Sequence, residues 1–477
     1  MLKKLSFTLN LILIFLTLII ITIMIISFLF LNKASINIIY MLVVFFINIV
    51  LIFCGIKLNR YSTKAFLAML ISISFIVYFI WNSYAMTVPI SDYKVLLEGA
   101  NKIVNGTFAG ESFDKTSYFY FYNYQIGYSL YLAFIIKIFG NSLIILKILE
   151  GAYMTLTSIV IYKIMIKIST HDAGAAASII YAMYIPNIMG SSIINNQHIS
   201  TLLLSLSLYF IFKSTKISLF IAGILLGFVQ IFRPIAIIVI IGVFIYYVYK
   251  MLKDKKYTNK LKLFIIFIIA FMLVVKTIDF AVVKFGLSPS PISTSNAKYF
   301  KFVLGLKGNG VYGIPTENAR RTQIYFDLKN LNFDYTKYNE QCIKTIEACI
   351  KDYKITVPFI QNKMLYFIGY TDNQYTFAVS GKKINNYVYM LSEMGSIQYG
   401  FLLIGTLVTL ILRFRNPVGE VDIFCILIIG FTLIHVFIET QTRYRYEIYL
   451  FITILTAQFI GEIINVTANK IYNSRLS

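Results

Sequence analysis

The stretch Pro-Ile-Ser-Asp-Tyr-Lys, residues 89–94, opens the first substantial polar break in this chain, which continues to Gly140. Apolar residues spaced three and four apart follow from Tyr93 to Val104, as is typical of an amphipathic helix. An aromatic block comes next, residues 118–127, which reads Tyr-Phe-Tyr-Phe-Tyr-Asn-Tyr-Gln-Ile-Gly. A carboxylate at the end of an apolar run, followed by these two segments, predicts a site at a membrane surface.

The composition of the chain is that of a membrane protein. Hydrophobic residues make up 58% of the 477 residues and charged residues only 13%, whereas soluble domains carry about 25% charged residues. The net charge of +22 would suit a nucleic-acid-binding protein, but Lys and Arg mostly separate apolar runs. That distribution reflects membrane topology. We therefore expect a multi-pass protein of the cell membrane, in contact with the lipid bilayer and with no nucleic-acid partner.

The apolar runs predict an all-α polytopic fold of about twelve transmembrane helices with both termini cytoplasmic. Two extra N-terminal helices fill residues 1–65, and a transmembrane core fills 66–284. This core includes 89–140 as the first outer loop, with juxtamembrane helices on the extracytoplasmic side. Residues 285–398 form a small, α-rich extracytoplasmic subdomain. The last transmembrane helices and a cytoplasmic tail occupy 399–477.

The segment Ile126 to Phe139 is apolar but shorter than the ~20 residues that a transmembrane helix needs. It also contains tyrosines and Lys137. We interpret it as an interfacial or re-entrant helix.

Cysteine and histidine are too few and too scattered to predict a metal site, since the chain has four Cys and three His. Cys342 and Cys349 lie on one face of a predicted helix, seven residues apart. That spacing separates them by about 10 Å, which is beyond the reach of a disulfide. Buried free thiols are therefore expected.

Several charges lie at the outer ends of predicted spans, against the positive-inside bias, most clearly Asp92, Arg233, Arg443 and Arg445. Ionisable groups in such places are candidates for function, although long side chains also reach the interface merely to stay hydrated. For the arginines both interpretations remain open. A functional role is favoured for Asp92, because it begins the most unusual loop in the chain.

Other patterns are weaker or absent. Gln197 and His198 are polar residues at the start of a span, and helix capping explains them at least as well as chemistry does. The chain contains neither a G-x-x-x-x-G-K-[ST] nor an H-E-x-x-H motif. An ATP-driven transporter of the usual kind and a zinc protease of that type are therefore not supported.

Taken together, these features resemble the GT-C superfamily of integral membrane glycosyltransferases. The narrower resemblance is to bacterial relatives of protein O-mannosyltransferases and aminoarabinose transferases. It rests on Asp92 after an outward span, on the amphipathic helix, and on the aromatic block continuing to Phe139-Gly140. The segment 232–234 (Phe-Arg-Pro) and the turn from Glu439 to Tyr444 add to it. So does a glycine pattern in the long loop, at Gly305, Gly308, Gly310 and Gly313.

The chain also departs from the pattern of that superfamily. Two extra spans precede the one that leads to Asp92, and Tyr93 stands where many relatives have a second acidic residue. Asn123 follows Tyr122 where relatives often have proline.

The resemblance implies transfer of a sugar from a polyprenyl-phosphate donor to an extracytoplasmic glycan, lipid or protein. No cofactor is expected, and nothing in the sequence requires a metal. In a single inverting displacement, Asp92 is the candidate general base, and Arg233, Arg443 and Arg445 are candidates for binding the phosphate. Candidates for lining the substrate or lipid are Tyr93, Lys94, Tyr122, Tyr124, Gln125, Gln197, His198 and Tyr444. The alternative is a transporter or flippase of lipid-linked saccharides, and a non-catalytic assembly protein is a third possibility. Transfer chemistry needs the Asp92 carboxylate, whereas the other two do not.

Overall fold

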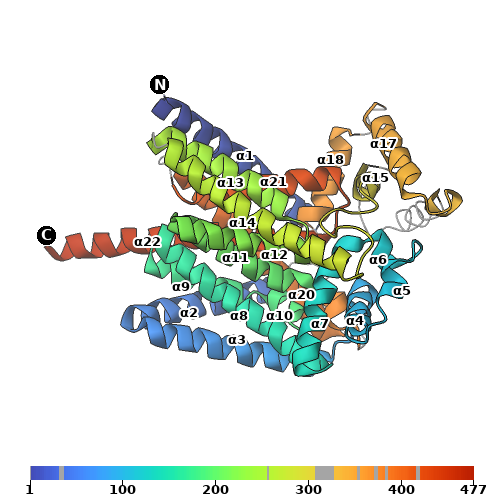
Figure 1. The fold of residues 1–477 in the computed structure, drawn as a ribbon. Coiled ribbons are helices and arrows are strands. Elements are labelled where there is room, and N and C mark those ends of the chain that lie inside the picture. Colours follow the sequence, from blue (N-terminus) through green and yellow to red (C-terminus); the bar gives the residue numbers. More distant parts are fainter. Residues whose placement is uncertain are drawn as a thin grey trace.

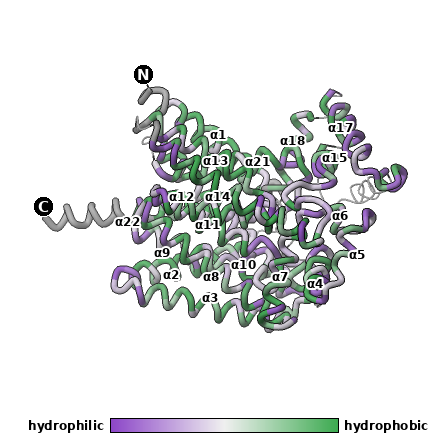
Figure 2. The backbone as a smooth tube through the Cα atoms, in the orientation of Figure 1, coloured by the Kyte–Doolittle hydropathy of each residue, from purple (hydrophilic) through white to green (hydrophobic). Residues whose placement is uncertain are grey.

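The computed structural model describes residues 2–31, 37–254, 257–306, 327–351, 355–369, 374–381, 385–414 and 419–476. It is a helical bundle whose long helices run roughly side by side (Figure 1). Both termini lie toward one end, and short helices gather at the other end, which we call the loop end. In Figure 2 the hydrophobic colour follows the helices through the bundle and the hydrophilic colour is concentrated toward its ends. The expected all-helical membrane fold is confirmed.

Seven helices of the described chain are long and apolar enough to cross a membrane. They are α1 (Leu2–Leu31), α2 (Ile38–Tyr61), α3 (Thr63–Ala85), α8 (Leu143–Ile168), α14 (Tyr257–Lys284), α20 (Asn386–Arg413) and α22 (Tyr446–Leu476). Three shorter helices are also apolar, namely α12 (Lys216–Phe232), α13 (Ala236–Asp254) and α21 (Asp422–Phe437). Length and hydropathy thus identify seven spans and three shorter apolar helices, and do not confirm the expected count of about twelve.

Two predicted spans fall outside this set for visible reasons. The apolar run at residues 174–194, within the predicted core, is divided into α9 (His171–Ala182) and α10 (Ile185–Gly190), and Pro186 lies in the first turn of α10. Proline is favoured there and cannot continue a preceding helix. The helix α11 (Asn196–Lys213) carries buried serines and threonines along its length, which lower its hydropathy.

The helix α7 (Ile126–Phe139) lies at the loop end, where it packs along α4 (Ser91–Val104) and reaches the end of α12. At 14 residues it is too short to be a transmembrane helix. Its Gly127 is needed for the approach to α12, because a Cβ at that position would lie 2.1 Å from the carbonyl oxygen of Ile231. The aromatic block is therefore held directly against the end of α12.

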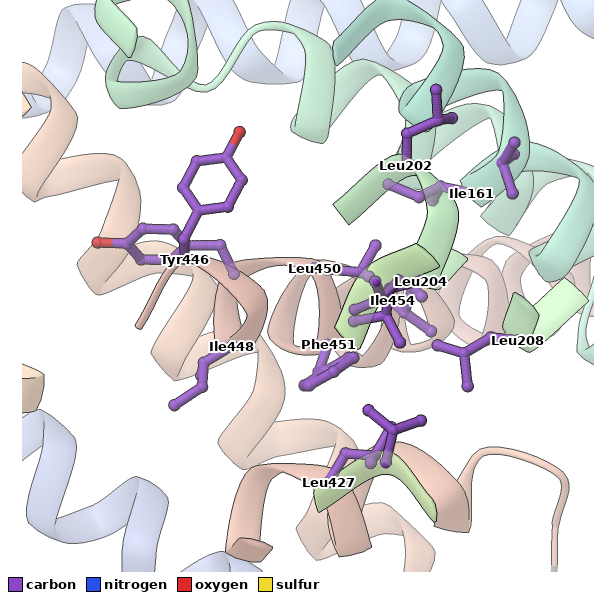
Figure 3. Close-up of a cluster of buried hydrophobic side chains, with 14 of the residues drawn as sticks. Ile161, Leu202, Leu204, Leu208, Leu427, Tyr446, Ile448, Leu450, Phe451 and Ile454 are labelled. Carbon is purple, nitrogen blue, oxygen red and sulfur yellow. The ribbon is translucent and has the colours of Figure 1, made fainter. Parts of the chain in front are cut away.

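The last helix, α22, is packed on several sides within the bundle, against α20, α9 and α21. Figure 3 shows its apolar side chains among those of α11 and α21; labelled are Leu450, Phe451 and Ile454 with Leu204, Leu208 and Leu427. In lipid, such packing rather than the hydrophobic effect holds helices together. The first turn of α22 and the short helix before it are consequently set on a rigid support.

At the loop end, the buried Asn123 joins the aromatic block to the segment that follows α14. Its Nδ2 donates to the carbonyl oxygens of Pro291 at 2.9 Å and Thr294 at 2.7 Å, and its Oδ1 accepts from the backbone N–H of Asn296 at 3.1 Å. The departure from proline at this position therefore has a structural role, since proline has no amide to offer.

The region 285–398 contains α15 (Phe300–Leu306), α17 (Tyr335–Lys351), α18 (Val357–Met364) and α19 (Gln374–Ala378), and α20 also begins within it, earlier than expected. Gly305 lies in α15, whereas Gly308, Gly310 and Gly313 fall outside the described residues. Cys342 and Cys349 are buried and free, as expected from their spacing. Burial raises the pKa of the Cys342 thiol to about 11, so this thiol stays protonated near neutral pH.

The contact between the two loop-end segments yields a labelling prediction. Thr116 and Thr294 are exposed and belong to segments that pack together, whereas the exposed Tyr61 lies at the turn between α2 and α3. Single cysteines at these positions, in a variant without the four native cysteines, are treated with a membrane-impermeant maleimide. We expect Thr116→Cys and Thr294→Cys to react in intact cells, and Tyr61→Cys only after permeabilisation. Reaction of just one of the two threonine positions would contradict the fold.

Candidate active site

The candidate site is built around an ion pair between the start of α4 and the turn that precedes α22. Asp92 lies in the first turn of α4, where the helix dipole favours a carboxylate. Its Oδ2 accepts a hydrogen bond from Nη2 of Arg443 at 3.1 Å. Arg443 also donates from Nη1 to the Tyr93 hydroxyl at 3.2 Å and from Nε to Gln441 Oε1 at 2.7 Å. Both edges of the guanidinium are thereby fixed.

The two partners of this ion pair differ in exposure. The Asp92 side chain is 38% exposed and the Arg443 side chain 14%. Oδ1 of Asp92 accepts no hydrogen bond from the part of the chain that the structure describes. The residue before it, Ser91, has a φ of +54°, a left-handed conformation that is uncommon outside glycine and concentrated at functional sites. Asp92 is thus oriented through one oxygen and accessible at the other.

A third side chain, Lys301 of α15, was not predicted from the sequence. Its Nζ lies 2.8 Å from Glu439 Oε2 and 3.4 Å from the hydroxyl of Tyr444. The backbone of Lys301 also accepts from the N–H of Glu439 at 3.1 Å, so α15 is fixed to the end of α21. This lysine belongs to the long loop, where an excess of lysine carries no topological information.

The aromatic block lies within electrostatic range of both Asp92 and Lys301. Burial raises the pKa of the Tyr118 and Tyr124 hydroxyls, the charge of Asp92 adds to the rise, and Lys301 opposes it. Both hydroxyls therefore remain neutral near pH 7 and act as hydrogen-bond donors rather than as bases.

Arg233, at the end of α12, pairs with the fully buried Glu447 in the first turn of α22. Arg233 Nε lies 3.2 Å from Glu447 Oε1, but neither carboxylate oxygen meets hydrogen-bond geometry with a described residue. We regard the contact as an attraction between charges rather than an aligned hydrogen bond. Arg233 and Lys301 both act electrostatically on His435 near the end of α21. Lys301 Nζ and the Arg443 guanidinium each lie 5.7 Å from the ring centroid of Tyr444. We call Arg233, Lys301 and Arg443, which come from three elements at the loop end, the cationic cluster.

Arg445 does not share the partners of Arg443. Its Nε donates to the Tyr449 hydroxyl at 2.5 Å, its Nη1 donates to the carbonyl oxygen of Phe367 at 3.3 Å, and its guanidinium lies 4.6 Å from the ring of Tyr399. Here it lines a small pocket between α1, α10 and α20. Residues two apart on the 3-10 helix Thr442–Arg445 point in different directions, because each residue turns by about 120°.

The other predicted residues divide between the site and its surroundings. Lys94 is exposed, and its Nζ lies 3.7 Å from Glu98 Oε1. Tyr122 and Tyr124 pack on each other with ring centroids 6.1 Å apart, and Gln125 has a buried amide oxygen without a hydrogen-bond partner among the described residues. Tyr444 contacts Lys301.

Gln197 and His198 are both buried, but only Gln197 touches the ion-pair residues. Its Nε2 donates to the backbone carbonyl of Arg443 at 2.6 Å. His198 instead places Nδ1 2.7 Å from Oε2 of Glu150, a buried acid on α8. Glu150 was not predicted, although an acidic residue inside the apolar run from Leu143 to Ile168 is itself a signal.

A membrane bundle with an oriented carboxylate, cations and neutral tyrosines at one end has the features expected of an integral membrane glycosyltransferase of the GT-C class. Comparison with known families agrees. The model of the dolichyl-phosphate-mannose-protein mannosyltransferase family matches residues 126–278, a segment that holds Gln197, His198 and Arg233. Over this segment the chain is similar to that family, and the match identifies the protein as a membrane glycosyltransferase that uses a polyprenyl-phosphate sugar. A search of curated proteins found no significant match.

The separation of the two arginines predicts different effects of their loss. Arg445→Ala leaves buried partners without a donor, which costs roughly 1–3 kcal/mol of stability. We expect a lower thermal unfolding temperature in lipid nanodiscs, while the folded fraction still prefers a polyprenyl monophosphate over the uncharged polyprenol. Arg443→Ala, the matched variant, should lose that preference. Loss of the preference in Arg445→Ala, with unchanged stability, would place the phosphate beside Arg445 instead.

Proposed function

We propose that this protein transfers a sugar from a polyprenyl-phosphate donor to an extracytoplasmic acceptor by a single inverting displacement, with Asp92 as the general base. The observation that carries the proposal is the geometry of the Asp92 carboxylate. Arg443 holds Oδ2 at 3.1 Å, and Oδ1 accepts no hydrogen bond from a described residue. One oxygen is thus fixed while the other remains available to take a proton.

The chemistry requires a base beside the attacking acceptor and cations beside the phosphate leaving group. The acceptor oxygen or nitrogen attacks the anomeric carbon, its proton passes to Asp92, and the bond from that carbon to the phosphate oxygen breaks. The electron pair of that bond leaves with the polyprenyl phosphate. Because the Asp92 side chain is 38% exposed, the proton can then pass to solvent.

The cationic cluster suits the leaving group. Arg443 and Arg233 offer guanidinium groups, which bind phosphate oxygens in a bidentate manner, and Lys301 adds a point charge. Cations fixed in place before the reaction stabilise the charge that develops on the phosphate without a cost of reorganisation at that moment. Each cation is balanced by a carboxylate, namely Asp92, Glu447 and Glu439 respectively.

Hydrogen-bonding groups for a sugar lie beside these charges. The amide oxygens of Gln125 and Gln197 are buried and have no hydrogen-bond partner among the described residues. Buried acceptors in proteins nearly always find a donor, and sugar hydroxyls are donors. The neutral hydroxyls of Tyr118 and Tyr124 supply the complementary donors.

We also propose that the loop end is extracytoplasmic and that the chain crosses the membrane twelve times. The basic residues at the end of α13 and the start of α14, which include Lys250 and Lys262, favour the cytoplasm for the opposite end. Counting α9 with α10 as one crossing and adding α11 to the apolar helices gives twelve alternating crossings: α1, α2, α3, α8, α9–α10, α11, α12, α13, α14, α20, α21 and α22.

The role of Asp92 is tested by Asp92→Asn, which removes the base but is nearly isosteric. We expect transfer of labelled sugar from a polyprenyl-phosphate donor to fall about 10²–10⁴-fold, the usual contribution of a positioned acid or base. Asp114→Asn is the matched control, because Asp114 is an exposed carboxylate in the same outer loop. Wild-type transfer by Asp92→Asn would make Asp92 structural and favour a transporter of lipid-linked saccharides.

The role of the arginines is tested by binding of a polyprenyl monophosphate in nanodiscs. Loss of a charged hydrogen bond costs about 1.5–3 kcal/mol, so Arg233→Ala and Arg443→Ala should each weaken binding roughly 10- to 150-fold. Arg→Lys should restore only part of the affinity, since lysine lacks the planar fork. Unchanged affinity in both alanine variants would assign these arginines to the scaffold of the bundle.

A further inference from the structure

The turn that opens α11 touches both elements that carry the arginines of the cationic cluster. Asn196 donates from Nδ2 to the backbone carbonyl of Phe232 at 2.8 Å, and Phe232 directly precedes Arg233. Gln197 donates from Nε2 to the backbone carbonyl of Arg443 at 2.6 Å. Two consecutive side chains thus hold two segments that are far apart in the sequence.

The position of these two amides at a helix start explains how they reach both segments. Consecutive residues on a helix project about 100° apart, so Asn196 and Gln197 face different neighbours. Asn195 caps the helix, because its Oδ1 accepts from the backbone N–H groups of Gln197 at 2.8 Å and His198 at 3.3 Å. The two amides therefore extend from a turn whose own backbone is fixed.

The turn that opens α11 is also held by the buried Glu150 of α8. Oε1 of Glu150 accepts from the backbone N–H of Asn195 at 3.2 Å and from the Tyr128 hydroxyl at 3.2 Å, and Oε2 lies 2.7 Å from His198 Nδ1. The His198 ring also packs on Tyr446, with ring centroids 5.4 Å apart. Burial of the Glu150 and His198 side chains makes this anchor rigid.

The contacts to both carbonyl oxygens have a defined direction. A backbone carbonyl only accepts hydrogen bonds, so the NH₂ group of each amide must face it. Phe232 is the last residue of α12, and the last four carbonyls of a helix lack intrahelical partners. Asn196 supplies the donor that Phe232 would otherwise lack, next to the residue that carries the charge.

We propose that Asn196 and Gln197 are positioning residues that fix the separation of Arg233 and Arg443, so that both guanidiniums meet one donor phosphate. The proposal rests on the phosphate-binding role given above to these arginines. Neither amide touches the phosphate. Asn196 acts through Arg233, and Gln197 acts through Arg443.

Crossed double-mutant cycles test this pairing. Asn196→Ala and Gln197→Ala are each combined with Arg233→Ala and with Arg443→Ala, and the affinity for a polyprenyl monophosphate in nanodiscs is measured, with polyprenol as the uncharged control. Each amide variant alone should weaken binding roughly 3- to 10-fold, the contribution of one hydrogen bond. The effect of Gln197→Ala should vanish with Arg443→Ala and persist with Arg233→Ala. Asn196→Ala should show the reverse pattern.

Each other outcome overturns the proposal in a recognisable way. If the effects of the amide and arginine substitutions on affinity add in all four combinations, the amides only maintain the fold. The same conclusion follows if the effect of each amide substitution shrinks equally with Arg233→Ala and with Arg443→Ala. In both cases the phosphate-binding role of the arginines is retained. If Arg233→Ala and Arg443→Ala alone leave the affinity unchanged, the phosphate site falls as well. Should an alanine variant fail to fold, Asn196→Leu and Gln197→Met keep the volume and remove the donor, and the same pattern is expected.

Discussion

The ion pair between Arg443 and Asp92 joins residues 351 positions apart in the sequence, and the candidate site depends on it. It ties the first helix of the loop end to the turn before α22, which is the helix packed among α20, α9 and α21. Partly exposed ion pairs contribute little to stability. This ion pair matters for geometry instead. It fixes one carboxylate oxygen of Asp92, the Tyr93 hydroxyl and the Arg443 guanidinium relative to one another at the loop end.

One short 3-10 helix carries two arginines whose side chains have different partners. Arg443 points to the Asp92 side, and Arg445 to the aromatic pocket lined by Tyr399. The helix itself is held by α22 beneath and by Gln197 from α11. A scaffold of packed helices thus carries a site whose own side chains are partly open, the arrangement that positioned acid–base chemistry requires.

Much of the site could be predicted from the sequence, because charges at the ends of apolar runs are costly and therefore informative. Asp92, Tyr93, Arg443 and Gln197 do meet, although only the resemblance to a family suggested that they would. Lys301 could not be predicted, because nothing in the sequence distinguishes it from the other lysines of the long loop. Only the contact between α15 and Glu439 sets it apart. The divergence of Arg443 and Arg445 depends on a 3-10 turn, which apolar periodicity does not reveal. The bundle was predictable as a class, but helices such as α9 and α11 are held by packing rather than by hydropathy.

The most direct test of the account is an electron cryo-microscopy structure of the protein in nanodiscs loaded with a polyprenyl monophosphate. The account predicts the phosphate within ion-pair distance of Arg443 and Arg233, with Asp92 facing the space beside it. Phosphate density in the pocket of Arg445, with Arg443 and Asp92 remote from it, would contradict the central claim.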